Sequence, residues 1–267
     1  MKKTGNIVLF ILATTIGHGQ HAIDSLKNLL ASSKPDTNRV LLLSELSVRS
    51  LSSDSKSAMK YATEGLTLAR ALKFKKGEAD CLRRSGIALF LEGNYPQALD
   101  IFQQALVISE DINDSFGIGA GLGHLGSVYK EQGDPVKARS YYYRFLKITQ
   151  ATQNKSEEAS AWARIGESFM DQGDLDSAEV AFNNAHSLET GLAGFFSNMG
   201  KLQTKRGNNK EAMTLYRRGI AYGNASNSLN ILSVIYVGMA DLYRHGGEIK
   251  VETKEGEGTT FTVVLSA

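Results

Sequence analysis

The feature that most constrains this chain is a glycine turn that returns at nearly constant spacing. The four turns are 40, 40 and 34 residues apart: Gly93-Asn94, Gly133-Asp134, Gly173-Asp174 and Gly207-Asn208. A glycine upstream and an alanine downstream keep the same register: Gly86, Gly126, Gly166 and Gly200, then Ala98, Ala138, Ala178 and Ala212. Periods of this length indicate repeated units stacked in a row, each packed chiefly against its neighbours.

Each period is expected to fold as a pair of helices. The turn glycine can adopt the left-handed conformation that ends a first helix, and the Asp or Asn after it can cap the second. Pro135 follows Asp134 at a first helical position, where its missing N–H costs nothing. Small residues such as Gly166 and Ala178 allow the paired helices to approach closely. The pattern therefore predicts an all-α region.

The period around Gly166 resembles a known repeat. Its letters, Trp162-x2-Ile165-Gly166-x2-Phe169 and then Ala178-x3-Phe182, are similar to the W-x2-L-G-x2-Y and A-x3-F pattern of the tetratricopeptide repeat. The resemblance extends over about residues 36–244. It implies a right-handed helical-hairpin solenoid of five repeats and half of a sixth. The first repeat, over 36–72, lacks the glycine turn.

The N-terminus is typical of an export signal. Lys2 and Lys3 precede an apolar run, and Gly17 and Gly19 supply small residues before a possible cleavage site. Residues 1–19 are therefore predicted to be a signal peptide, and the protein to be periplasmic or extracellular. A buried N-terminal helix is the alternative, and a signal kept uncleaved would be an anchor. Residues 20–35 are expected to form a helix that covers the first repeat.

The helical pattern ends at Arg244, and residues 245–267 alternate as a β-hairpin does. This segment resembles the last hairpin of the ATP-binding domain of sensor histidine kinases. In that family the region of Thr259 or Thr260 lies near the nucleotide. The hairpin is expected either to cover the open end of the last repeat or to be a poorly docked tail.

The kinase resemblance does not imply kinase activity. The phosphoacceptor histidine context, the magnesium-binding asparagine helix, the adenine-binding segment and the glycine lid have no counterpart in the sequence. The nucleotide-site remnant is therefore expected to be non-functional, and its residues are Gly256, Gly258, Thr259 and Thr260. The chain is predicted to be no enzyme and to need no cofactor, with an ATP-binding histidine kinase of a phosphorelay as the alternative. A gene deletion, a chimera or an assembly error would each explain such a remnant.

The resemblance to tetratricopeptide repeats also implies where a partner would bind. First helices line the inner face of such solenoids, so positions between their packing residues are groove candidates. The predicted groove residues are Arg83, Arg84, Phe90, His124, Lys130, Arg164, Glu167, Asn198 and Lys201. This mildly basic set would suit a protein or an extended acidic peptide. The alternative is that these residues are ordinary solvated helix faces.

Composition excludes several other classes of function. A net charge of +2, from 30 basic and 28 acidic residues, gives no strong electrostatic case for nucleic acid. A single cysteine, Cys81, leaves no disulfide framework or thiolate metal site, and the five histidines lack ligand spacing. Beyond the signal, no apolar run is long enough for a transmembrane helix. The sequence thus predicts a non-catalytic interaction module that binds neither metal nor nucleic acid.

Overall fold

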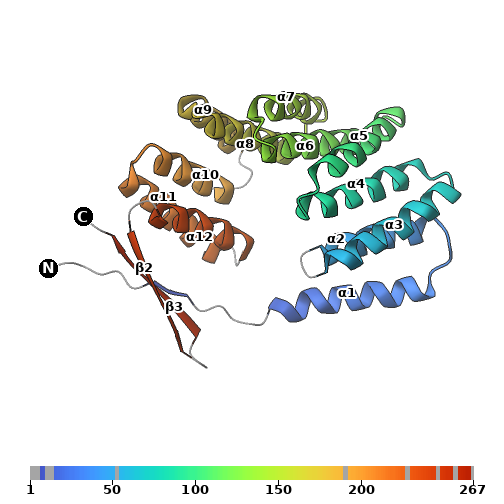
Figure 1. Cartoon of the computed structure of the whole chain (residues 1–267), viewed down its shortest axis with the longest axis horizontal. Coiled ribbons are helices and arrows are strands. Elements are labelled where there is room, and N and C mark those ends of the chain that lie inside the picture. Colours follow the sequence, from blue (N-terminus) through green and yellow to red (C-terminus); the bar gives the residue numbers. More distant parts are fainter. Residues whose placement is uncertain are drawn as a thin grey trace. The chain divides into compact units, whose positions relative to one another are not determined.

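A computed structural model describes residues 7–9, 15–51, 54–188, 192–225, 229–244, 247–254 and 258–265 (Figure 1). These residues form twelve helices and three short strands. Contacts divide the chain into a first unit, residues 14–168, and a second unit, residues 169–267 with 1–13. Among the described residues, no helix is both long and apolar enough to cross a membrane.

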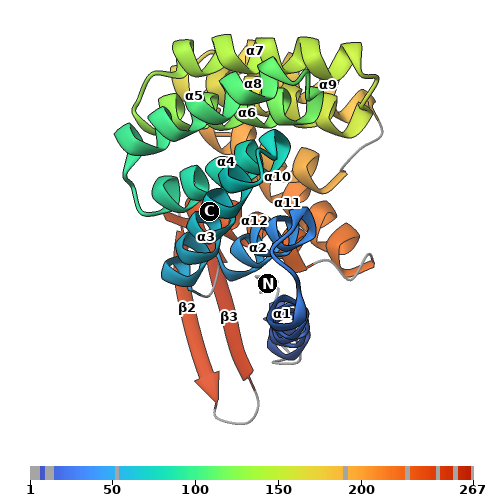
Figure 2. The ribbon, with the colours of Figure 1, turned by 90° about the vertical axis from the view of Figure 1, so that its right-hand side faces the viewer.

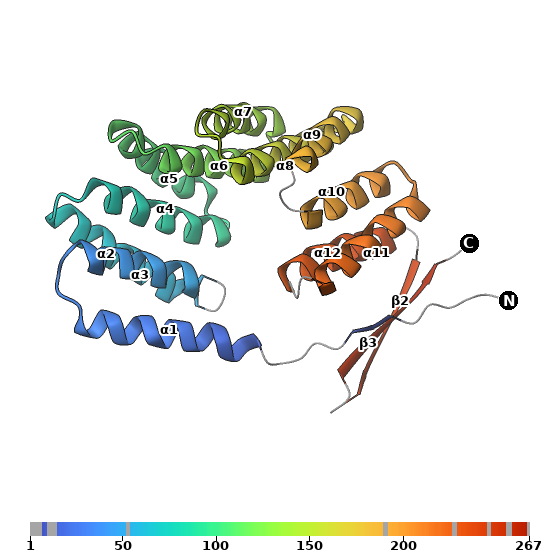
Figure 3. The same cartoon turned by 180° about the vertical axis from the view of Figure 1, so that it is seen from behind.

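The first unit is a run of helical hairpins. Its helices are α1 (Thr15–Ser32), α2 (Thr37–Ser50), α3 (Ser55–Ala71), α4 (Lys75–Leu91), α5 (Tyr95–Asp111), α6 (Ser115–Glu131), α7 (Pro135–Ala151) and α8 (Lys155–Gln172), of which the last continues into the second unit. The hairpins are α2–α3, α4–α5 and α6–α7, and α1 packs on α2 (Figure 3). The first helices of successive hairpins, α2, α4 and α6, also contact one another. Helix α1 crosses the predicted signal boundary at residue 19.

The second unit contains α9 (Leu175–Ser187), α10 (Leu192–Lys205), α11 (Asn209–Ala225) and α12 (Leu229–Arg244). One of its cores surrounds Phe182 and Leu202, and another surrounds Tyr216 and Ile235. The strands β1 (Ile7–Leu9), β2 (Gly247–Lys254) and β3 (Gly258–Leu265) pair antiparallel in the order β1-β3-β2. Figure 2 shows β2 and β3 side by side. In this register Val251 lies opposite Phe261.

The glycine turns have the predicted conformation. Gly93, Gly133, Gly173 and Gly207 all have positive φ, between 77° and 88°. Asp134 and Asp174 cap the following helices, because each accepts a hydrogen bond from a backbone N–H three residues later, at 2.9 Å and 3.1 Å. The prediction of a cap was wrong for Asn94, whose side chain makes no such bond.

A contact between glycine and an aromatic ring joins the two helices of a hairpin. A Cβ added at Gly126 would overlap the ring of Tyr142, and Gly86 lies in the same way against Phe102. In the second unit Gly200 lies against Tyr216. The three rings are almost completely buried, with at most 1% of their surface exposed. The predicted close approach of paired helices is therefore confirmed at Gly86, Gly126 and Gly200, where the glycine leaves the space that the ring fills.

Two glycines of α6 should respond in opposite ways to alanine. Gly126→Ala forces a methyl group into the Tyr142 ring and should lower the free energy of unfolding by about 1–3 kcal/mol. Gly123→Ala is the matched control, because its Cβ would meet only Phe145, at 3.9 Å. This control should raise stability by roughly 0.5–1 kcal/mol through helix propensity. Urea unfolding measures both, and equal effects would contradict the proposed role of Gly126.

Candidate partner-binding face on the first helices

Three predicted groove residues occupy one repeat position on successive first helices. They are Arg84 on α4, His124 on α6 and Arg164 on α8, spaced by 40 residues. Each arginine donates a hydrogen bond to a serine on the preceding first helix. The distance is 3.4 Å from Arg84 Nε to Ser44 Oγ and 2.7 Å from Arg164 Nη1 to Ser127 Oγ. Within the described part of the chain, neither arginine has a carboxylate at ion-pair distance.

His124 lies between these two arginines in the repeat register and is uncharged at neutral pH. Its ring stacks on Phe102, with the ring centroids 4.8 Å apart and the planes 12° from parallel. Burial lowers the pKa of His124 to about 3, and the positive charges of Arg164, Arg83 and Arg84 act in the same direction. The side chain can therefore donate or accept a hydrogen bond to a partner without adding charge.

The structure places Arg83 elsewhere than predicted. Its side chain is only 5% exposed, because it forms an ion pair with Asp80 and extends beneath the ring of Phe116, 5.5 Å from the ring centroid. The expectation that Arg83 faces an open groove was therefore wrong. In the second unit Asn198 is also buried, at 8% exposure, whereas Lys201 is partly exposed.

The remaining predicted residues have structural partners. Lys130 on α6 and Glu167 on α8 form an ion pair of 2.9 Å that joins two successive first helices. Phe90 packs against Tyr95 of α5, with ring centroids 5.6 Å apart. Of the predicted nucleotide-site remnant, Gly258, Thr259 and Thr260 belong to β3, and Gly256 lies outside the described residues.

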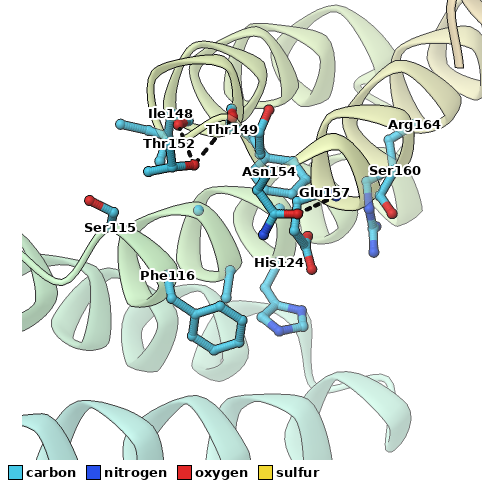
Figure 4. A pocket seen from close by; sticks show the side chains of 14 residues that line it. Ser115, Phe116, His124, Ile148, Thr149, Thr152, Asn154, Glu157, Ser160 and Arg164 are labelled. Atoms are coloured by element: carbon cyan, nitrogen blue, oxygen red, sulfur yellow. Dashed lines mark hydrogen bonds between the residues drawn. The ribbon is translucent and has the colours of Figure 1, made fainter. Parts of the chain in front are cut away.

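A pocket of about 380 Å³ opens beside this row, between α6, α7 and α8. It is lined by Ser115, Phe116, Gly119, Ala120, Gly123, His124, Phe145, Ile148, Thr149, Thr152, Asn154, Glu157, Ser160 and Arg164. Figure 4 shows the rings of Phe116 and His124 together at one side, with Thr149 and Thr152 at the opposite side. Of these residues, only His124 and Arg164 were predicted from the sequence. Gly119 and Gly123, one helical turn apart, are the sequence signal that could have indicated the pocket.

A wider and shallower hollow of about 680 Å³ contains the other arginine of the row. It lies between α1, α2 and α4, and Arg84 lines it together with Glu45 and Asp80. Leu26, Leu29, Leu41 and Leu42 supply its apolar wall. Each hollow contains one arginine of the row formed by Arg84, His124 and Arg164. The row is therefore a polar strip with an apolar recess beside each arginine.

Two observations on the described residues concern metal binding and thiol chemistry. They contain no cluster of three or more histidine, cysteine or acidic side chains that could hold a metal ion. Burial raises the pKa of the Cys81 thiol to about 12, so the thiol stays protonated and unreactive at neutral pH. What the arrangement can do is donate charge-assisted hydrogen bonds and cover apolar groups.

Comparison with known proteins agrees with this architecture. Residues 77–151 match the family model of the tetratricopeptide repeat. Human tetratricopeptide repeat protein 29 is 25% identical over 130 residues, which are 49% of this chain and 27% of that protein. The chain spans less than two thirds of the length of each curated relative compared. Residues 77–151 are thus similar to tetratricopeptide repeats, as the sequence predicted for this part of the chain.

Solved structures show the same fold at low sequence identity. The structure of BtubC from P. vanneervenii is 18% identical with a TM-score of 0.61, covering 82% of this chain and 93% of that one. A Rap protein complexed with Competence and Sporulation Factor is 15% identical with a TM-score of 0.62, covering 86% and 72%. At this identity the likeness establishes the fold alone.

The depressed pKa of His124 predicts a pH-dependent stability. The unfolded chain takes up a proton near pH 6.5 and the folded chain near pH 3, so folding loses stability as the pH falls from 6.5 towards 3. At pH 5 the loss due to this one group is about 2 kcal/mol at most. Urea unfolding of the wild type and of His124→Gln at pH 7 and pH 5 should show a smaller loss in the variant. Equal losses, or an NMR titration of His124 near pH 6.5, would contradict the assignment.

Proposed function

We propose that this protein is a non-catalytic interaction module whose first-helix face, in residues 14–168, binds an extended acidic segment of a partner protein. The observation that carries the proposal is the pair of equivalent guanidinium groups, Arg84 and Arg164. Each is fixed by a neutral serine and none of the described carboxylates lies within ion-pair distance. A partly buried arginine in that state has hydrogen-bond donors left for a partner carboxylate.

The spacing of the row supports an extended rather than a compact ligand. Arg84 and Arg164 lie two repeats apart, and His124 holds the same position on the helix between them. A chain that follows successive first helices would reach all three positions in turn. The Rap structure, with the same fold, was solved as a complex with Competence and Sporulation Factor, and this supports the view that such a stack can hold a partner.

We also propose that the protein has no enzymatic activity. The absence of sequence segments for a phosphoacceptor or a nucleotide site supports a non-enzymatic role. The family match covers residues 77–151, so the likeness of residues 245–267 to a kinase hairpin remains a hypothesis about ancestry. Export to the periplasm or beyond is likewise proposed, on the basis of residues 1–19. ATP binding at millimolar nucleotide in a calorimetric titration would favour the kinase alternative.

The proposal is tested by selection from a displayed library of random peptides, about twelve residues long, on the immobilised full chain. Enriched peptides should be acidic. A double variant, Arg84→Gln with Arg164→Gln, should bind them at least tenfold more weakly, because charge-assisted hydrogen bonds contribute about 1.5–3 kcal/mol each. Higher salt should weaken the wild-type complex as well.

The matched control is Arg144→Gln with Lys147→Gln on α7. It removes the same charge from exposed positions outside the face, where Arg144 pairs with Glu110 at 3.5 Å and lies 5.7 Å from the ring centroid of Tyr141. This control should bind as the wild type does. Equal binding by the wild type and the Arg84/Arg164 variant, or a library that yields no binder, would overturn the proposed function.

A further inference from the structure

We propose that the pocket between α6, α7 and α8 is an anchor for one large apolar side chain of the partner, with a neighbouring carboxylate of the partner held by Arg164. This rests on the proposed function and assigns a particular place and residue pattern within it. The pocket lies wholly within the first unit. Its volume of about 380 Å³ is in the range of sites that enclose small ligands, which is about 300–1,000 Å³.

Gly123 leaves the space of this pocket open, and the packing of the helices does not require a glycine at this position. A Cβ at Gly117 would lie 2.5 Å from Ser109 Oγ, and one at Gly119 would lie 3.1 Å from Phe145. A Cβ at Gly126 would overlap the ring of Tyr142, and one at Gly121 would lie 3.4 Å from Leu106. At Gly123, by contrast, the nearest atom is at 3.9 Å, an ordinary contact distance. The absence of a side chain at Gly123 therefore leaves the pocket open and is not required for the packing of the helices.

The other repeats carry a side chain at this position. Three residues before the motif glycine, they have Arg83, Ala163 and Ser197. Glycine in mid-helix costs roughly 0.5–1 kcal/mol relative to alanine, so its presence in α6 needs an offsetting reason. The space that it leaves beside the arginine row supplies that reason.

The walls of the pocket are suited to an apolar group. Phe116 is 57% exposed, a large apolar surface left in water, and Arg83 beneath the ring holds it in place. Phe145 and Ile148 from α7 and Ala120 from α6 complete the apolar lining. A partner side chain that covers Phe116 and fills the pocket would stabilise the complex by about 25 cal/mol for each Å² of apolar surface removed from water.

Two oppositely charged residues that line the pocket give the bound segment a direction. Arg164 and Glu157 both lie on α8, seven residues or about 10 Å apart along the axis. Arg164 attracts a carboxylate of the segment, and Glu157 repels one. His124, which also lines the pocket, is neutral at physiological pH. The occupant that fits is therefore a segment with an acidic residue on one side only of its apolar residue.

The test uses the peptides that the library selection yields. They should share a large apolar residue next to Asp or Glu on one fixed side. Gly123→Leu places a side chain in the pocket and should weaken their binding at least tenfold, with Gly123→Ala intermediate. Both variants should unfold at or above the wild-type temperature, because leucine and alanine are good helix formers. Arg164→Gln should abolish the preference for the acidic neighbour, whereas Arg144→Gln should leave it intact.

A second measurement covers the case in which Gly123→Leu does not fold. The apolar residue of a selected peptide is replaced by a photoreactive phenylalanine, and the crosslink to the wild-type chain is located by mass spectrometry. Attachment within residues 115–124 or 145–152 supports the anchor. Attachment elsewhere, or undiminished affinity in a folded Gly123→Leu, overturns the anchor but leaves the proposed function standing if the Arg84/Arg164 variant still binds weakly. A library without binders would overturn both.

Discussion

Three hairpins, α4–α5, α6–α7 and α10–α11, depend on a glycine on the first helix that lies directly against an aromatic ring of the second. At Gly86, Gly126 and Gly200 no side chain would fit beside Phe102, Tyr142 and Tyr216. The contact lets the two backbones approach closely and buries the ring almost completely. Because it recurs in register, it fixes the rotation of α4 and α6 about their own axes. The residues that remain outside the contact, including Arg84 and His124, are thereby presented along a common face.

In helix α6, glycines make close contacts with both neighbouring helices. Its glycines lie close to Ser109 of α5 and to Phe145 and Tyr142 of α7, so it is packed closely on two sides. Such a helix has a low intrinsic propensity, and its stability comes from packing on its neighbours. Gly123 is the least crowded of these glycines, because a Cβ there would meet its nearest neighbouring atom at 3.9 Å. The same helix thus combines tight packing with a hollow that the partner is proposed to fill.

Much of the architecture could be predicted from local patterns. The left-handed turns at Gly93, Gly133, Gly173 and Gly207 follow from the missing Cβ of glycine, which the letters display directly. The turns between hairpins were invisible in the sequence. There the left-handed residues are Lys73, Asn113 and Gln153, with φ of 54° to 55° and the same spacing of 40 residues. Their conformation is imposed by the packed helices on either side, so no glycine marks them.

The sequence by itself determined the repeat, the helical hairpins and the column that contains Arg84, His124 and Arg164, because helical period and turn chemistry act over a few residues. Only the tertiary structure decided how those side chains are used. It buried Arg83 with Asp80, tied Lys130 to Glu167, and left Arg164 held by a serine beside the pocket. These outcomes depend on which atoms of separate helices meet. Sequence spacing sets the direction of a side chain, but packing decides whether it meets a protein partner or solvent.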